Sequence, residues 1–124
     1  MKVISTNKAP AAIGPYSQAI VTGGYVFTSG QIPIDPATGE VAGDCIVCQA
    51  EQVMANLKEV LEAAGASFES AVKTTCFLAD MADFAAFNGV YEKYFVNKPA
   101  RSCVAVKTLP KGVKVEVEVI AEIG

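Results

Sequence analysis

The fold is decided by residues 113–122, which read Val-Lys-Val-Glu-Val-Glu-Val-Ile-Ala-Glu. Valine or alanine occupies every second position, and lysine, glutamate or isoleucine stands between them. Because side chains alternate between the two faces of a strand, this pattern predicts a half-buried β-strand with one charged side. It also predicts that the sheet containing this strand packs one face against a core.

Two upstream segments repeat apolar residues at helical spacing. The first runs from Asp44, the expected N-cap, to about Ala64, and Gly65 is its expected stop. The second begins at Asp80 or Asp83 and carries an aromatic stripe, which is more typical of core packing than of a cofactor site. The periodic residues are Ile46, Ala50, Val53, Leu57, Val60, Leu61 and Ala64 in the first segment and Phe84, Phe87, Val90, Tyr91 and Tyr94 in the second.

The remaining β-rich runs predict strands over residues 2–5, 18–21, 25–29, 72–78 and 101–107. Gly23-Gly24 predicts a hairpin turn between the second and third of these strands. The order of strands, helix, strand, helix and two strands predicts one α+β domain over residues 1–124, with two helices on one face of a single sheet. The other sheet face must be polar or covered by further copies of the chain, and the 52% hydrophobic composition favours further copies.

Composition limits the chemistry that this chain can perform. Histidine is absent, which excludes Ser-His and Cys-His nucleophilic pairs and any histidine metal ligand. The net charge of −3 and the lack of a basic stripe argue against nucleic acid as the main partner. No apolar stretch approaches the roughly 18 residues of a membrane span, and residues 1–7 turn polar too early for a signal peptide. We therefore expect a cytosolic protein with no membrane partner.

Four cysteines occur, at positions 45, 48, 76 and 103. In a cytosolic chain this loose spacing is typical of reduced thiols rather than of a disulfide framework. Cys45 and Cys48 form a CxxC motif, but the second CxxC or the histidines of a zinc site are absent. A redox pair at a helix start is an alternative, although the intervening Ile46-Val47 is apolar and no Trp or Pro marks a redox turn. We expect the two cysteines to pack at the start of the first helix.

Arg101 is the only arginine among ten basic residues, and it opens an apolar, β-rich run. A guanidinium grips a carboxylate or a phosphate through two parallel hydrogen bonds, which lysine cannot reproduce. Arg101 is therefore a candidate anion clamp, and a purely structural ion pair is the alternative.

The strand alternation places Arg101, Cys103 and Ala105 on one side of their strand. If the turn at residues 109–112 closes a tight hairpin, Glu116 lies opposite Ala105 and projects to the same side as Arg101. The two side chains would then leave room for a small anion and one water. A one-residue slip in register would turn Glu116 to the other face, where it would be only one of several solvated glutamates.

Gly30 and Tyr16 are two further candidates. Gly30 could expose its backbone N–H to an anion, or it could simply end a strand. Tyr16 could cover a pocket with its ring and hydroxyl, or it could be a packing residue.

Four segments together resemble the Rid family of reactive-intermediate imine deaminases, and its RidA subgroup in particular. The likeness extends over essentially the whole chain, and the four motifs follow the family's order. They are Ala-Ala-Ile-Gly-Pro-Tyr-Ser-Gln at 11–18, Thr-Ser-Gly-Gln-Ile-Pro at 28–33, Val-Lys-Thr-Thr at 72–75 and Pro-Ala-Arg-Ser-Cys-Val at 99–104.

This resemblance implies a chorismate-mutase-like fold and a homotrimer, in which the sheets face a central barrel and three sites lie at the subunit interfaces. It implies hydrolysis of 2-iminopropanoate and 2-iminobutanoate to 2-oxo acids and ammonia, with no cofactor and no metal. A non-catalytic regulatory trimer that binds 2-oxo acids is the first alternative. A nucleic-acid protein and a thiol-redox or chaperone protein are two others.

The resemblance also implies roles for individual residues. Arg101 would clamp the substrate carboxylate, and the Gly30 N–H would share it. Glu116 and the backbone carbonyl of Cys103 would position the attacking water. The rest of the pocket would be lined by Tyr16, Ser29 and, as a weaker member, Asn88.

Overall fold

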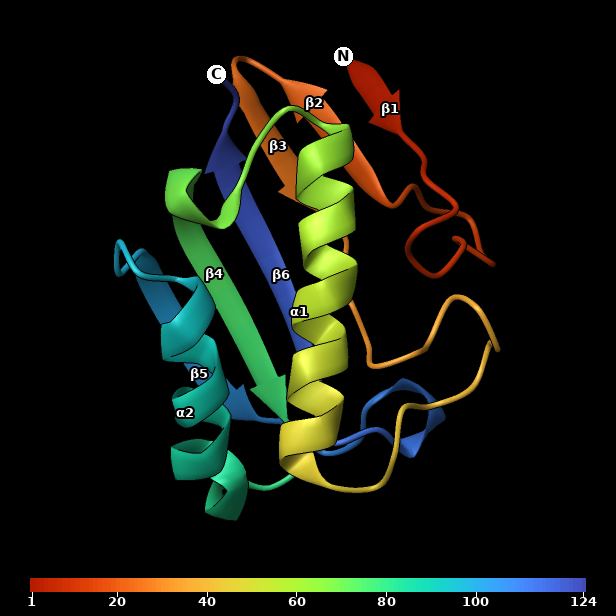
Figure 1. Cartoon of the computed structure of the whole chain (residues 1–124), viewed down its shortest axis with the longest axis vertical. Helices are drawn as coiled ribbons and strands as arrows, with labels where there is room; N and C mark the ends of the chain where they lie inside the picture. Colours follow the sequence, from red (N-terminus) through yellow and green to blue (C-terminus); the bar gives the residue numbers. More distant parts are fainter.

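The computed structural model describes all of residues 1–124. The main elements are β1 (Lys2–Ile4), β2 (Ala19–Thr22), β3 (Tyr25–Thr28), α1 (Ile46–Ala63), β4 (Ala71–Leu78), α2 (Phe84–Tyr94), β5 (Ala100–Ala105) and β6 (Val115–Glu122). Three short 3-10 turns join them: η1 (Phe68–Ser70), η2 (Met81–Asp83) and η3 (Pro110–Gly112). The strands form one sheet in the order β1-β2-β3-β6-β4-β5, and both helices cover the same face of it (Figure 1). The expected α+β fold with two helices on one face is confirmed.

The predicted hairpin between the last two strands is wrong. β6 pairs antiparallel with β4, and β4 pairs in parallel with β5, so β4 lies between the two strands. A parallel pair needs a crossover connection, and α2 supplies it between β4 and β5. Glu116 therefore pairs with Phe77, whereas Ala105 pairs with Leu78.

The predicted hairpin between β2 and β3 is confirmed. Ala19 to Thr22 pair antiparallel with Thr28 to Tyr25. Gly23 and Gly24 both adopt positive φ, at 60° and 83°. A two-residue turn of this kind matches the twist of the strands that it joins.

The start of α1 differs from the expectation in two ways. Cys45, not Asp44, is the N-cap, and its sulfur accepts a hydrogen bond from the backbone N–H of Cys48 at 3.0 Å. Cys45 and Cys48 are also joined by a disulfide, so the expectation of four reduced thiols is wrong for this pair. A separation of three residues around a helix start brings the two Cα atoms to 5.3 Å, within the range that a disulfide requires. Cys76 and Cys103 are free thiols, as expected.

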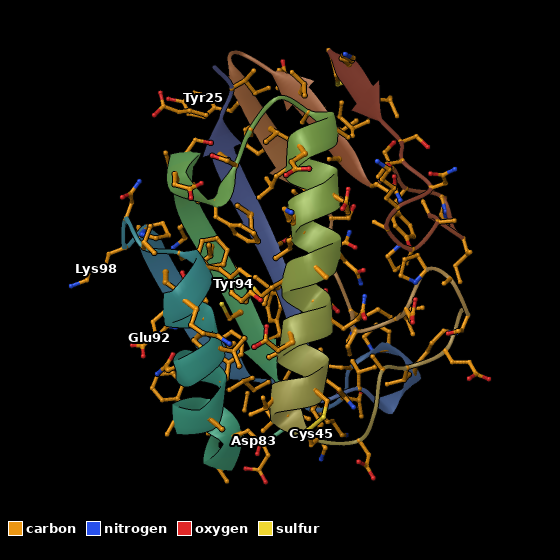
Figure 2. All side chains as sticks on the ribbon, viewed as in Figure 1. Tyr25, Cys45, Asp83, Glu92, Tyr94 and Lys98 are labelled. Atoms are coloured by element: carbon orange, nitrogen blue, oxygen red, sulfur yellow. A yellow bond between two sulfur atoms is a disulfide. The ribbon has the colours of Figure 1, made fainter.

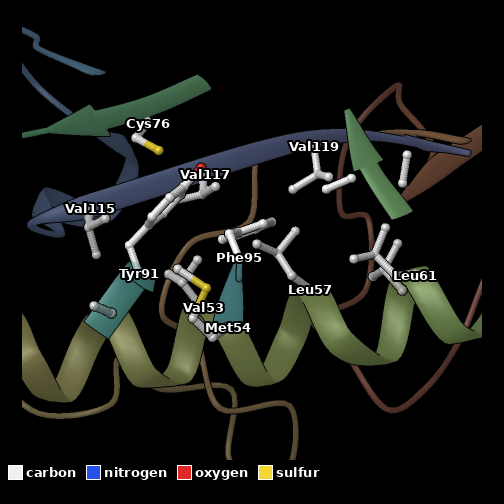
Figure 3. Close-up of a cluster of buried hydrophobic side chains, with 14 of the residues drawn as sticks. Val53, Met54, Leu57, Leu61, Cys76, Tyr91, Phe95, Val115, Val117 and Val119 are labelled. Atoms are coloured by element: carbon white, nitrogen blue, oxygen red, sulfur yellow. The ribbon is translucent and has the colours of Figure 1, made fainter. Parts of the chain in front are cut away.

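The core lies between the sheet and the helices (Figure 3). Val115, Val117 and Val119 of β6 are at most 1% exposed and pack toward side chains of α1, including Leu57 and Leu61. Burying a side chain of this size contributes roughly 1.5–3 kcal/mol. The period-two pattern of β6 thus holds the helices on one face, as the sequence predicts. Neither helix combines the length and the hydrophobicity that crossing a bilayer requires.

The other face of the sheet carries no helix. On this bare face Glu116, Glu118 and Ile120 of β6 are only half-buried. Phe27 is 41% exposed and Val104 is 46% exposed. The bare face therefore combines carboxylates with large apolar side chains that nothing in the chain covers.

Candidate active site

Arg101 lies on β5 and faces the helix-covered side of the sheet. Its guanidinium carbon is 4.7 Å from the centroid of the Tyr91 ring and 5.5 Å from that of Phe84, and both rings belong to α2. Its Nη1 donates a hydrogen bond to Oδ1 of Asn88 at 2.7 Å. Stacking on aromatic faces holds a guanidinium without neutralising it.

Arg101 forms no ion pair, because the salt bridges of the chain join other residues: Lys58 to Glu62 and Lys93 to Glu51. The structural ion pair that the sequence left open is therefore absent. The guanidinium keeps donors free for an anion, with its plane fixed by α2. This is the state that a carboxylate clamp requires.

Tyr91 is itself fixed by a contact with the sheet. Its hydroxyl hydrogen-bonds the buried Thr74 hydroxyl at 2.7 Å, and Thr74 pairs with Arg101 across β4 and β5. Burial raises the pKa of Tyr91 above its ordinary value, so the phenol stays neutral. The sequence placed Tyr91 in the core stripe and did not single out Thr74. The spacing of Asn88 and Tyr91 on one helical face is the signal that could have linked Tyr91 to the arginine.

Cys103 lies two residues beyond Arg101 on the same face of β5 and pairs with Cys76 of β4. Burial raises the pKa of the Cys103 thiol, and it raises the pKa of Cys76 to about 12. Neither sulfur is a thiolate near neutral pH. The side chain of Cys103 is therefore not a nucleophile, which leaves its backbone as the part that could serve the site.

Glu116 lies on the bare face, so the expectation that it projects to the same side as Arg101 is wrong. Paired residues of neighbouring strands share a face. Arg101 pairs with Thr74, which is buried under the helices, whereas Glu116 pairs with Phe77 on the opposite side. Within one chain the two residues are separated by the thickness of the sheet.

Gly30 lies directly against Glu116. A methyl group added at Gly30 would overlap the Glu116 carboxylate, so only glycine lets that carboxylate lie over the backbone there. The Gly30 N–H donates to no carbonyl or side chain of the protein. A free backbone donor thus stands beside a carboxylate that forms no ion pair.

The pKa of Glu116 is raised, first by burial and then by the neighbouring Glu118 carboxylate. Burial disfavours the charged form of an acid, and a like charge nearby does the same. A carboxyl group tuned upward in this way is better matched to accepting and returning a proton near neutral pH. It is a common property of catalytic acids and bases.

A hollow of about 320 Å³ opens beside Gly30. Tyr16, which is 52% exposed, lines it together with Gly30 and Gln31. Lys111, a residue that the sequence reasoning did not consider, lies on its rim and is one of two non-glycine residues with positive φ. The Ser29 hydroxyl donates a hydrogen bond to the carbonyl of Ser17, so its proton is not free to bind a ligand.

The expected site residues thus fall into two groups. The arginine group consists of Arg101, Asn88 and Cys103 on the helix-covered face. The glutamate group consists of Glu116, Gly30, Ser29 and Tyr16, beside the bare face and the hollow. No cluster of three or more cysteines or carboxylates lies close enough to hold a metal ion.

Known proteins with this sequence pattern extend over the same length. The family model described as Endoribonuclease L-PSP matches residues 6–123. The 2-iminobutanoate/2-iminopropanoate deaminase of Salmonella typhimurium is 52% identical, over 97% of this chain and 96% of its own. A RutC family protein of Haemophilus influenzae is 54% identical, over 97% and 95%.

Among solved structures, E. coli TdcF with bound serine superposes with a TM-score of 0.94 at 46% identity, and the match covers 100% of both chains. The fold is therefore shared from end to end. The chain belongs to the Endoribonuclease L-PSP family, which is the Rid family that its motifs indicate.

Proposed function

We propose that this protein hydrolyses 2-imino acids, in particular 2-iminobutanoate and 2-iminopropanoate, to 2-oxo acids and ammonia. The observation that carries the proposal is a guanidinium without an ion-pair partner, Arg101, held against two aromatic rings of α2 in a chain that has no other arginine. A small acid with one carboxylate is the ligand that such a group selects.

Substrate binding would use both groups of residues. Arg101 holds the carboxylate through two parallel hydrogen bonds, and the free Gly30 N–H supplies a third donor. Tyr16 covers the hollow beside Gly30 and limits the size of the substrate's side chain.

The chemical step needs little beyond orientation and proton transfer, because an imine carbon is already electrophilic. Glu116 accepts a proton from the attacking water as the carbinolamine forms. It then returns a proton to the departing ammonia. The Cys103 carbonyl accepts a hydrogen bond from the same water and aims it at the imine carbon.

The placement of Arg101 and Glu116 supports a homotrimer with sites between copies. The two residues face opposite sides of one sheet, so one chain cannot bring both to the same substrate. A neighbouring copy can present its arginine group to the glutamate group of the first. Three sheets that face a central barrel would also cover Phe27 and Val104, which one chain leaves exposed.

The comparisons support this proposal from two directions. A 52% identical relative carries the name of the same deaminase activity. TdcF holds serine, an amino acid with one carboxylate. Because that structure contains a bound amino acid rather than an imine, a regulatory trimer that binds small carboxylates without turnover is the second candidate.

A ribonuclease activity, which the family's description names, is not proposed. The chain carries a net charge of −3 and contains no histidine for general acid-base cleavage of RNA.

The test is a competition assay for the imine. A threonine dehydratase generates 2-iminobutanoate, semicarbazide traps it, and the rate of semicarbazone formation is followed with wild type and Arg101→Ala. Wild type should suppress the signal, and Arg101→Ala should lose about a hundredfold or more, because two charge-assisted hydrogen bonds are removed. Arg101→Lys keeps the charge without the fork and should lose at least about tenfold.

Lys58→Ala is the matched control, because it removes an exposed positive charge from α1. It should behave as wild type. If wild type binds 2-oxobutanoate but leaves the semicarbazone signal unchanged, the regulatory candidate replaces the enzyme. Full activity in Arg101→Ala would mean that the clamp lies elsewhere.

A further inference from the structure

The disulfide between Cys45 and Cys48 lies at the solvent-exposed start of α1, where Figure 2 draws it beside the Cys45 label. Both cysteines are exposed, and Val47 between them is 46% exposed. Neither sulfur belongs to the arginine group or the glutamate group. We propose that Cys45 and Cys48 form a reversible thiol–disulfide exchange site for low-molecular-weight thiols and disulfides, separate from the deaminase site.

The position of the bond is unlike that of a structural staple. Its two cysteines are three residues apart, so it joins no distant parts of the chain. The entropic gain from a disulfide grows with the length of the closed loop, and this loop is close to the shortest possible. The bond can therefore open without releasing any other element of the fold.

The start of α1 is held by contacts that do not involve sulfur. The amide of the buried Gln49 donates to the carbonyl of Gly43 and accepts from the backbone N–H of Lys114. Ala50 and Val53, one turn further along, are fully buried. These contacts fix the helix start to the loop before it and to the residue that precedes β6, so the two sulfurs stay close together after the bond is reduced.

The surroundings of Cys45 favour a thiolate at that position. The backbone N–H of Cys48 donates to the Cys45 sulfur, and an α-helix of 18 residues extends behind it. The first turn of this helix contains no acidic residue, and the nearest carboxylate in sequence is the exposed Asp44. A helix N-terminus stabilises a thiolate and so makes it both a better leaving group and an accessible nucleophile.

The other two thiols of the chain provide an internal contrast. Cys76 is fully buried, and burial raises its pKa to about 12. Burial also raises the pKa of Cys103. Exchange should therefore be confined to the exposed pair, although all four cysteines share one small domain.

The exchange proceeds in two balanced steps. A thiolate from a small thiol attacks Cys45 Sγ, a mixed disulfide forms there, and Cys48 leaves as a thiolate that takes a proton from water. A second small-molecule thiolate then attacks the small-molecule sulfur of the mixed disulfide. This step releases the oxidised small disulfide, and Cys45 departs as the thiolate that the Cys48 N–H stabilises. The protein gains two electrons from the two small thiolates, and it gains one proton at Cys48 and a second when the Cys45 thiolate is protonated by water.

The experiment equilibrates the folded protein in reduced and oxidised glutathione at a series of ratios. Exchange is stopped by acid, free thiols are alkylated, and the alkylation of each cysteine is measured by peptide mass mapping. The governing ratio is the squared concentration of reduced glutathione divided by the concentration of oxidised glutathione. Alkylation of Cys45 and of Cys48 should increase in parallel as this ratio increases, while Cys76 stays protected throughout. Circular dichroism should remain unchanged across the series.

Two single variants identify the attacked sulfur. Cys48→Ser should retain one glutathionyl group on Cys45, because no neighbouring thiol can displace it. Cys45→Ser should acquire the group on Cys48 more slowly, because only the Cys45 sulfur accepts the backbone hydrogen bond at the helix start. The double variant Cys45→Ser/Cys48→Ser should lose the exchange and keep imine hydrolysis, so failure of this proposal is distinguishable from failure of the deaminase proposal.

Two results would overturn the exchange site. The pair could remain a disulfide at every glutathione ratio and in excess dithiothreitol while the protein stays folded. It could also remain fully alkylated in oxidised glutathione, which would mean that no disulfide forms. Either result assigns the cysteines to the helix cap alone.

Discussion

The two faces of the sheet differ in how complete they are within one chain. The helix-covered face buries Val115, Val117 and Val119 under α1 and α2, and it holds Arg101 against the rings of Tyr91 and Phe84. The bare face leaves Phe27 exposed and presents Glu116 without an ion-pair partner. The first face is a closed hydrophobic core with a candidate binding group at its edge. The second face is left uncovered by the single chain.

This difference explains why the candidate site is divided. Strict alternation along β5 and β6 sends the arginine to one face and the glutamate to the other. A single chain therefore places the proposed carboxylate clamp, Arg101, and the proposed base, Glu116, on opposite faces of its sheet. Assembly of copies would cover the bare face and would also bring the Arg101 of one copy to the Glu116 of another.

The largest expected effect separates the stability of the chain from its assembly. Leu57 is fully buried on the covered face, so Leu57→Ala should lower the free energy of unfolding by about 2–5 kcal/mol. Phe27 lies on the bare face, so Phe27→Glu should leave the unfolding of the single chain nearly unchanged and should instead dissociate the trimer. Denaturant unfolding measures the first effect, and light scattering measures the second.

Two results would contradict this division into a core face and an interface face. The Phe27→Glu variant could unfold, or the variant could remain trimeric with full activity. In the first case the bare face would be part of the core. In the second it would not be an interface.

A smaller effect is expected at Gly30, on the glutamate side. Gly30→Ala places a methyl group where the Glu116 carboxylate lies, so that carboxylate must move. The catalytic rate constant should fall by about tenfold or more, because misplacement of a general base is costly. Thermal stability should change little, since Gly30 does not have positive φ.

Gly89→Ala is a suitable control for this variant. Gly89 is on α2, and an added methyl group there meets no atom within 4 Å. It should keep full activity. Equal activity of Gly30→Ala and wild type would remove Glu116 from the mechanism.

The smallest expected effect is a shift in the pH profile. Burial and then Glu118 raise the pKa of Glu116. Because the base works as a carboxylate, activity should fall as the pH drops through this raised pKa. Glu118→Gln removes the second cause, lowers the pKa of Glu116 and should move the acidic limb of the kcat/KM profile to lower pH.

Glu122→Gln, on the same strand, is the control and should leave the acidic limb in place. A shift of that limb to higher pH in Glu118→Gln would contradict the assignment of Glu116.

The local elements of the fold were predictable because each follows from a repeat in the sequence. The period-two pattern of β6, the helical spacing in α1 and the paired glycines between β2 and β3 all produce the expected element. The partner of β6 was not predictable in the same way. A short connection at residues 109–112 favours a hairpin with β5, but sheet order depends on where α2 carries the chain, and no local pattern encodes that.

The sequence indicated which residues are candidates for the site, but it did not indicate how they lie relative to one another. Arg101 stands out by its rarity, and the structure places Gly30, another expected site residue, beside Glu116. The predicted sheet face of Glu116 depended on the mistaken hairpin, so Glu116 was assigned to the wrong face of the sheet. Tyr91 and Thr74 were missed as supports of Arg101, because a core residue and a positioning residue have the same spacing on a helix. The Cys45–Cys48 disulfide was missed because the expected compartment argued for thiols.

The most direct test of the divided site mixes two inactive variants. Arg101→Ala and Glu116→Gln are unfolded together in equal amounts, refolded, and assayed for imine hydrolysis beside each variant refolded alone. If each site takes its arginine from one copy and its glutamate from the next, random trimers contain an intact pair at about one quarter of their sites. We therefore expect the mixture to recover about a quarter of wild-type activity. A mixture no more active than the separate variants would contradict it and would place Arg101 and Glu116 in one chain's site or in none.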